Sequence, residues 1–243
     1  MKSGPLRRFF TNIICAFIYN PDRRKKWRVV LNSPVLSYLR FIRRDLGMRP
    51  RHIHLMVGFR AKNLLIAVND AYIYKFPLRN PNYKSLAQRE VRITTALGPV
   101  SPIHIPDVRL LTHGDILVRR YEWIRGMGIR QLPPDDAARL HPQLIHQIAQ
   151  FVYSIGIADP VEIRDLKPAA DATPARGYGW YHWDVFDNFL IDPITGDITA
   201  MIDWEDCKFG DFGIELTRNR HRDVYPFMDA VWAEYNRLYD MAH

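Results

Sequence analysis

The sequence has little cysteine, no excess of glycine or proline and no long apolar run. Its two cysteines, Cys15 and Cys207, lie far apart in the chain, which excludes a disulfide framework and a cysteine-rich zinc site and favours a reducing compartment. The 13 glycines and 17 prolines among 243 residues follow no period, which excludes a collagen-like or low-complexity chain. No apolar stretch approaches the roughly 20 residues that span a bilayer. We therefore expect a globular protein of the cytoplasm.

The positive charge is concentrated at the N-terminus. The whole chain carries a net charge of +8, whereas residues 1–50 alone carry twelve Lys and Arg against Asp22 and Asp45, a net of +10. The remainder of the chain is therefore slightly acidic. Any anionic partner that this charge attracts is expected to meet the first 50 residues.

An apolar stripe precedes a basic cluster in this segment. Apolar residues recur at steps of three and four, which predicts an amphipathic helix: Leu6, Phe9, Phe10, Ile13, Ile14, Phe17 and Ile18. The basic cluster follows at Arg23–Arg28. Two interpretations stay open: a helix that packs on the protein's own core or on a partner, and a helix that lies in the surface of an anionic membrane. A nucleic-acid arm is the least favoured interpretation, and we expect no nucleic-acid partner.

Residues 53–76 are predicted to form strands. Leu64–Val68 and Ala71–Phe76 are rich in β-branched, aliphatic and aromatic residues, and Asn69-Asp70 between them tolerates the positive φ of a tight hairpin turn. Residues 110–124 read as two further strands. Gly58 lies in the loop before the first hairpin strand, where a glycine allows the backbone to approach a phosphate.

A carboxylate lies on the apolar face of the next predicted helix. Residues 83–97 have helical periodicity, and Glu90 falls on the same face as Leu86 and Ile93. Burying a carboxylate is costly unless a cation meets it. The nearest candidate in the preceding strand is Lys75; a Glu90 that reaches solvent at the edge of the stripe is the alternative.

Oxygen side chains converge at a second predicted hairpin. Residues 188–192 and 198–202 are two short apolar strands joined by a turn, so antiparallel pairing brings Asn188 and Asp203 to one edge, with Asp184 in the loop that enters the hairpin. Carboxylate and amide oxygens suit Mg²⁺, which substrate phosphates usually complete. Turn-forming residues at strand ends are the alternative. The upstream pair of Lys75 and Glu90 favours the magnesium interpretation.

These motifs in this order resemble the protein-kinase-like fold: Lys75, Glu90, His182-x-Asp184, Asn188 and Ile202-Asp203-Trp204. Over residues 53–215 the chain is most similar to the aminoglycoside and choline phosphotransferase branch, near small bacterial sugar and lipopolysaccharide kinases. The resemblance implies a two-lobed α+β fold with a small antiparallel-sheet N-lobe and a mainly helical C-lobe. With a Gly-bearing break near residue 126, it divides the chain into a basic amphipathic helical extension (1–50), an N-terminal nucleotide-binding lobe (51–126) and a C-terminal catalytic lobe (127–243).

The resemblance also implies an enzyme, a phosphotransferase that uses ATP and Mg²⁺. Lys75, held by Glu90, would orient the α- and β-phosphates under the loop at Gly58. Backbone groups near Glu122 and Ile124 would bind adenine, because Tyr121–Gly126 resembles the hinge between the two lobes.

The remaining motif residues would carry out the transfer. Asn188 and Asp203 would hold Mg²⁺, and Asp184 would orient the acceptor hydroxyl and accept its proton. His182, grouped with Asp184 as a catalytic-loop residue, is expected to support the loop rather than act as the base. The spacing from Asp184 to Asn188 is one residue shorter than is usual in the family, so Asp187 is the alternative to Asn188.

The acceptor is expected to be a hydroxyl of a sugar or of a lipopolysaccharide-type glycan at the membrane surface, because the N-terminal segment has the character of a peripheral membrane anchor. The protein would then lie on the inner face of the cytoplasmic membrane. Two alternatives stay open: a catalytically weak pseudokinase that acts as a regulatory module, and a small-molecule kinase of the aminoglycoside or choline type.

Overall fold

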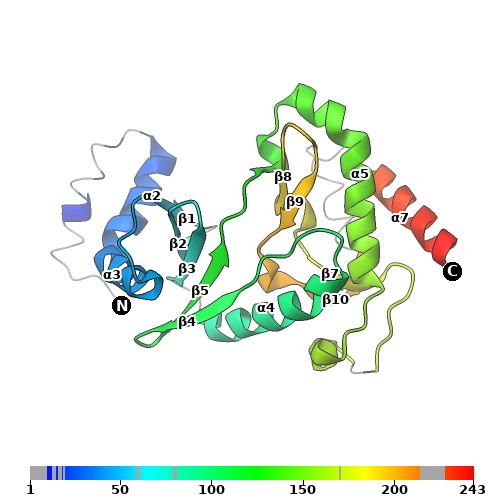
Figure 1. Ribbon diagram of the computed structural model, residues 1–243, viewed down its shortest axis with the longest axis horizontal. Helices are drawn as coiled ribbons and strands as arrows, with labels where there is room; N and C mark the ends of the chain where they lie inside the picture. Colours follow the sequence, from blue (N-terminus) through cyan, green and yellow to red (C-terminus); the bar gives the residue numbers. More distant parts are fainter. Residues whose placement is uncertain are drawn as a thin grey trace. The chain divides into compact units, whose positions relative to one another are not determined.

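The computed structural model describes residues 10–12, 15, 18, 20–58, 61–78, 81–169, 171–213 and 228–243 (Figure 1). The chain forms two compact units. The first unit comprises Met1–Ala87 and Arg109–Trp123, and the second comprises Gln88–Val108 and Ile124–His243. The expected division into an antiparallel-sheet part and a more helical part is present.

In the described residues, the first unit contains a five-stranded sheet that helices α2 and α3 precede in the chain. Its elements are α2 (Pro21–Asn32), α3 (Val35–Leu46), β1 (Ile53–Val57), β2 (Asn63–Val68), β3 (Tyr72–Pro77), β4 (Arg109–His113) and β5 (Ile116–Glu122). The strand order is β1-β2-β3-β5-β4, and every neighbouring pair is antiparallel. Asn69 and Asp70 turn the β2–β3 hairpin with φ of 56° and 49°, the left-handed conformation that the sequence predicts there.

Helix α3 supplies the core of this unit together with one face of the sheet. Tyr38 stacks on Phe76 with ring centroids 4.0 Å apart, and Phe41 meets the same ring edge-on at 6.1 Å. Ile42 is completely buried beside them. Each such side chain contributes roughly 1.5–3 kcal/mol when it leaves water. Helix α3 is therefore not part of an extension separate from the sheet, as the sequence-based division has it, because the apolar face of β2 and β3 needs a covering layer and α3 provides it.

A polar network fixes α3 to the sheet. The hydroxyl of Tyr74 on β3 donates to Asp45 at 2.6 Å, and Arg120 on β5 pairs with the same carboxylate at 2.7 Å. Both charged side chains are largely buried. Burial and the neighbouring Asp45 raise the pKa of Tyr74. The carboxylate of Asp45 thus serves two partners at once.

Most of the apolar N-terminal stripe at residues 6–18 lies outside the described residues. Of its members, Phe10 is exposed and Ile18 is half-buried. The basic cluster after it is described: it lies on α2, where Arg23, Lys25, Lys26 and Arg28 are exposed.

The second unit is mainly helical. Its larger elements are α5 (Pro134–Gly156), β6 (Met127–Gly128), β7 (Tyr178–Tyr181), β8 (Phe189–Ile191), β9 (Ile198–Met201), β10 (Lys208–Asp211) and α7 (Met228–Ala242). Short 3-10 helices are η2 (Gly98–Val100), η3 (Ile129–Gln131), η4 (Val161–Leu166), η5 (Val185–Asp187) and η6 (Trp204–Asp206). Strands β6, β8 and β9 form one small antiparallel sheet and β7 pairs with β10 in another. Gly179 of β7 approaches α5 so closely that a Cβ there would lie 1.8 Å from the carbonyl oxygen of Gly156.

Helix α4 (Tyr83–Leu97) joins the two units along the chain. Its C-terminal part belongs to the second unit because Ile93 and Leu97 are buried in the same cluster as Phe151 and Trp180. The chain later passes from the first unit to the second between Trp123 and Ile124. The expected boundary at residues 126–127 lies close to this crossing. The sequence-based division, however, assigns all of α4 to the N-terminal lobe, whereas the contacts of the chain assign α4 from Gln88 onward to the second unit.

Candidate active site

The β8–β9 hairpin brings Asn188 and Asp203 to one edge of the small sheet. Phe189 lies opposite Met201 in antiparallel register. One residue beyond this pair, the amide of Ile202 donates to the carbonyl of Asn188 at 3.1 Å. Asn188 therefore begins the hairpin at the edge where Asp203 follows the second strand, which is the arrangement that the sequence pattern predicts.

Asp184 is tied to this edge by a single 3-10 turn. The side-chain amide of Asn188 donates to the carbonyl of Asp184 at 3.0 Å, and the backbone amide of Asp187 donates to the same carbonyl at 3.1 Å. The intervening turn is η5. A loop one residue shorter than the family's usual one thus still connects Asp184 to Asn188, while Asp187 is exposed.

Two residues of this region, Trp183 and Asp203, have a left-handed backbone. Trp183 has φ of 79° and Asp203 has φ of 65°, a conformation that costs a residue other than glycine about 1–3 kcal/mol. The turn after Asp203 is stabilised by Trp204, whose buried indole donates to the carbonyl of Met201 at 2.8 Å. Such strain concentrates at functional sites because the surrounding structure must enforce it.

His182 is buried and precedes Asp184 by two residues in the chain. It is 1% exposed, and its ring meets that of Trp204 edge-to-face with centroids 4.9 Å apart. Burial lowers the pKa of His182 to about 4, although the charge of Asp203 acts in the opposite direction. Within the described residues neither ring nitrogen makes a hydrogen bond. The backbone of Ile202 also acts to raise the pKa of His182, but burial has the larger effect. A neutral, buried ring fits the expected supporting role.

In the first unit, the strand positions place a second cation beside Lys75. Lys75 on β3 lies directly opposite Arg119 on β5, and the two side chains are only 6% and 3% exposed. Directly opposite residues share a face of the sheet, so both point away from the face that α3 covers. Sequence reasoning missed Arg119. The signal was available, since Val118 faces the core and its neighbour must face the other side.

The remaining predicted site residues are divided between the units. Glu90 is completely buried and belongs to the second unit. Gly58 donates its amide to the carbonyl of Asn63 at 3.0 Å, and a Cβ at this position would make only ordinary contacts. Space therefore does not require glycine at residue 58, and residues 59–60 of the same loop are outside the described part. Glu122 is the last residue of β5 in the first unit, whereas Ile124 is the first residue of the Ile124–His243 segment of the second unit.

The donor set at the hairpin edge suits a magnesium ion that phosphates complete. Among the described residues no group of three or more His, Cys, Asp or Glu side chains could hold a metal by itself. Asn188 and Asp203 supply one amide and one carboxylate. Because the Asn188 nitrogen is directed to the Asp184 carbonyl, its Oδ1 is the atom available to a cation. Magnesium typically takes one or two carboxylates together with substrate phosphates, and these residues fit that pattern.

Comparison of sequences finds no matching family and no matching curated protein. Solved structures do match. The GDP complex of wild-type aminoglycoside 2'-phosphotransferase-IIIa is 17% identical, with a TM-score of 0.69 over 84% of this chain and 83% of that one. The streptomycin-ATP-APH(2")-IIa ternary complex is 12% identical, with a TM-score of 0.59 over 84% of each chain.

A macrolide enzyme matches as well. Macrolide 2'-phosphotransferase MphH from Brachybacterium faecium is 16% identical, with a TM-score of 0.54 over 82% of each chain. The matches extend over both units and over most of each neighbour. The chain therefore has the protein-kinase-like fold of the aminoglycoside and macrolide phosphotransferases.

Proposed function

We propose that this protein is a nucleotide- and Mg²⁺-dependent phosphotransferase that phosphorylates a hydroxyl group of a small, sugar-like molecule. The observation that carries the proposal is the convergence of Asp184, Asn188 and Asp203 at one hairpin edge, in a fold shared with phosphotransferases. Solved neighbours include complexes with GDP and kanamycin and with ATP and streptomycin. They support a small-molecule acceptor, one of the sequence-based alternatives, better than they support a membrane glycan.

In the proposed reaction, the acceptor oxygen attacks the γ-phosphorus, the bond from that phosphorus to the bridging oxygen breaks, and the hydroxyl proton passes to Asp184. The products are the phosphorylated acceptor and a nucleoside diphosphate. Asn188 and Asp203 would hold the magnesium ion, which neutralises charge on the phosphates. The turn at η5, which fixes the backbone of Asp184 against Asn188, supports this role.

On the nucleotide side, we propose that Lys75 contacts the phosphates and pairs with Glu90. Two observations support the pair: Lys75 is 6% exposed and Glu90 is 0% exposed, and buried charges persist in proteins when opposite charges meet them. A double-mutant cycle of Lys75→Met and Glu90→Gln, read in nucleotide affinity, tests this step. A coupling energy near zero would contradict the pair. Gly58 and the backbone near Glu122 and Ile124 remain the proposed nucleotide contacts.

The decisive experiment measures nucleoside diphosphate release from ATP and from GTP, with and without Mg²⁺. The acceptor panel contains aminoglycosides, macrolides, free sugars and lipid-linked glycans, and mass spectrometry locates the new phosphate. Asp171→Asn is the control for Asp184→Asn, because Asp171 is an exposed carboxylate of the same unit and is not one of the proposed site residues. If neither nucleotide is hydrolysed or raises the thermal midpoint, the regulatory, non-catalytic alternative replaces the proposal.

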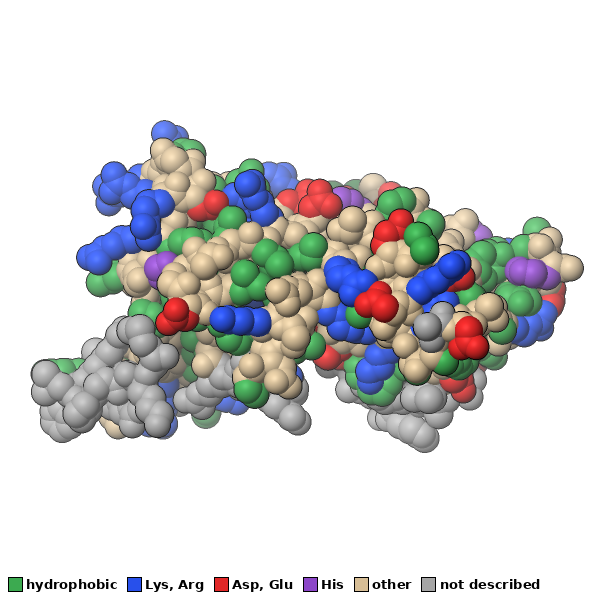
Figure 2. Space-filling model, turned by 90° about the horizontal axis from the view of Figure 1, so that it is seen from below, with side chains coloured by type: hydrophobic (Ala, Val, Ile, Leu, Met, Phe, Trp, Pro, Cys, Tyr) green, Lys and Arg blue, Asp and Glu red, His purple; other side chains and the backbone are tan. Residues whose placement is uncertain are grey.

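Contact with an anionic membrane is a second proposal, and the exposed basic side chains of α2 favour it. Lys and Arg side chains gather over the N-terminal helices in Figure 2, and Trp27 among them is 43% exposed. In the described part of the chain no helix is long and apolar enough to cross a membrane. Under this proposal, electrostatic attraction and a partly inserted Trp27 would hold the protein at the membrane surface. Under this proposal a lipid-linked glycan is the acceptor to test first.

A further inference from the structure

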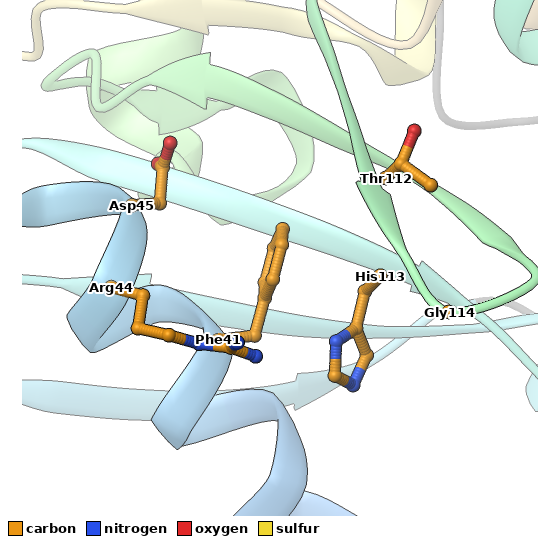
Figure 3. A pocket seen from close by; sticks show the side chains of 6 residues that line it. All are labelled: Phe41, Arg44, Asp45, Thr112, His113 and Gly114. Atoms are coloured by element: carbon orange, nitrogen blue, oxygen red, sulfur yellow. The ribbon is translucent and has the colours of Figure 1, made fainter.

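A pocket of about 380 Å³ lies in the first unit, between α3 and the turn that joins β4 to β5 (Figure 3). Its lining residues are Phe41, Arg44, Asp45, Thr112, His113 and Gly114. The volume falls in the range of roughly 300–1,000 Å³ that small-molecule sites occupy. None of these residues belongs to the proposed phosphotransfer site, and Lys75 points from the opposite face of the sheet.

The pocket forms because a tight hairpin end meets an aromatic helix face. His113 and Ile116 pair across a two-residue turn, in which Gly114 has φ of 57°. The ring of His113 then packs against α3, tilted on Phe41 with centroids 4.8 Å apart. Ser37 on the same helix contacts Nε2 of His113 at 3.0 Å. The imidazole is therefore fixed in orientation, and Nδ1 is the nitrogen that a ligand can reach.

The charge that acts on this ring is that of Arg44. Arg44 extends towards His113 in Figure 3, and a ring nitrogen faces it. Burial lowers the pKa of His113, and the charge of Arg44 lowers it further. Asp45 lines the pocket, but its carboxylate already accepts from Tyr74 and Arg120. The other titratable groups nearby are Tyr38 on α3 and Asp115 in the turn.

We propose that this pocket binds the phosphate group of a small molecule between Arg44 and Nδ1 of His113, with the ring of Phe41 against the apolar part of the ligand. A phosphate would pair with the guanidinium and accept from the imidazolium, so it would remove the unfavourable juxtaposition of the two bases. Phosphate-bearing metabolites and phospholipid headgroups share this chemistry. Arg44 lies in the last turn of α3, where its positive charge interacts favourably with the helix dipole. That role explains neither the pocket nor the fixed orientation of His113.

The test follows the C2 proton of His113 by NMR during pH titrations, with the signal assigned by loss in His113→Gln. Inorganic phosphate or glycerol 3-phosphate is expected to raise the pKa of His113 in a saturable way. In Arg44→Gln this rise should disappear, and without phosphate the pKa should already lie higher than in the wild type, because the neighbouring charge is gone. Arg40→Gln is the control: Arg40 is exposed on the same helix but does not line the pocket.

Several outcomes decide the matter. A phosphate-dependent rise in the wild type and in Arg40→Gln, but not in Arg44→Gln, supports the site. If only phosphatidylglycerol vesicles produce the rise, and Arg44→Gln removes it, a lipid headgroup is the source of the phosphate. No rise in the wild type, or an equal rise in Arg44→Gln, overturns the proposal. Because the measurement does not involve nucleotide, its failure leaves the phosphotransferase proposal untouched.

Discussion

Lys75 and Arg119 lie side by side on one face of the sheet, on adjacent strands and both buried. Directly opposite residues have Cβ atoms roughly 4.5–5.5 Å apart, and like charges in such positions repel. Under the proposed function, two adjacent positive charges on one face of the sheet suit the phosphates of a nucleotide.

We therefore expect Arg119→Met to weaken nucleotide binding about tenfold, which corresponds to about 1.4 kcal/mol. The unliganded protein should keep its fold, because methionine keeps much of the apolar bulk of this buried side chain. Calorimetric titration with nucleotide and Mg²⁺ measures the affinity, and thermal unfolding measures the stability. Arg109→Met on neighbouring β4 is the control, since Arg109 is exposed. Unchanged affinity with a lower thermal midpoint would assign Arg119 a structural role only.

Asp184 and Asp203 should differ in what their substitution removes. Asp184→Asn is expected to lower turnover at least about a hundredfold, the scale of a positioned acid–base group, while nucleotide affinity persists. Asp203→Asn should weaken the binding of the magnesium–nucleotide complex. Asparagine tolerates the left-handed backbone of Asp203, so the fold should survive both changes. Equal and mild effects of the two substitutions would show that the roles are misassigned.

The buried His182 should make folding stability depend on pH. Its folded pKa of about 4 lies below the ordinary value of 6.5, so the unfolded chain binds a proton first as the pH falls. The stabilising contribution is complete above pH 6.5 and is lost as the pH falls towards 4, by roughly 3 kcal/mol in all. Denaturant unfolding at pH 7 and pH 5 should show a smaller difference in His182→Phe, which keeps an aromatic ring against Trp204. An identical difference in wild type and variant would refute this.

Reversing the charge of α2 should release the protein from anionic vesicles. Each basic residue near such a surface contributes about 1 kcal/mol, and salt screens this attraction. The variant replaces Arg23, Lys25, Lys26 and Arg28 by Glu; Arg24 is kept because it donates to the carbonyl of Ile18 at 2.8 Å. Co-sedimentation with anionic and with neutral vesicles measures binding. Turnover on a soluble acceptor should be unchanged, and equal sedimentation with both vesicle types would argue against an electrostatic contact.

The sequence by itself determined the local features of this protein. The turn at Asn69-Asp70 follows from residues that tolerate positive φ, and the approach of Asn188 to Asp203 follows from two apolar strands with a short turn between them. Such neighbours along the chain can be paired from periodicity and turn chemistry alone. The order of the motifs likewise pointed to the fold that the solved structures share.

Only the tertiary structure decided what lies against each element. The pattern of α3 identifies an apolar face, but its partner, Phe76 on β3, follows from long-range packing. The same holds for Ile93 of α4, which joins the core of the second unit. The position of Arg119 beside Lys75 follows from the register of β3 and β5, because the two residues are far apart in sequence. Periodicity tells which side of an element is apolar, whereas register and covering layers depend on the whole chain, because burial is gained between distant segments.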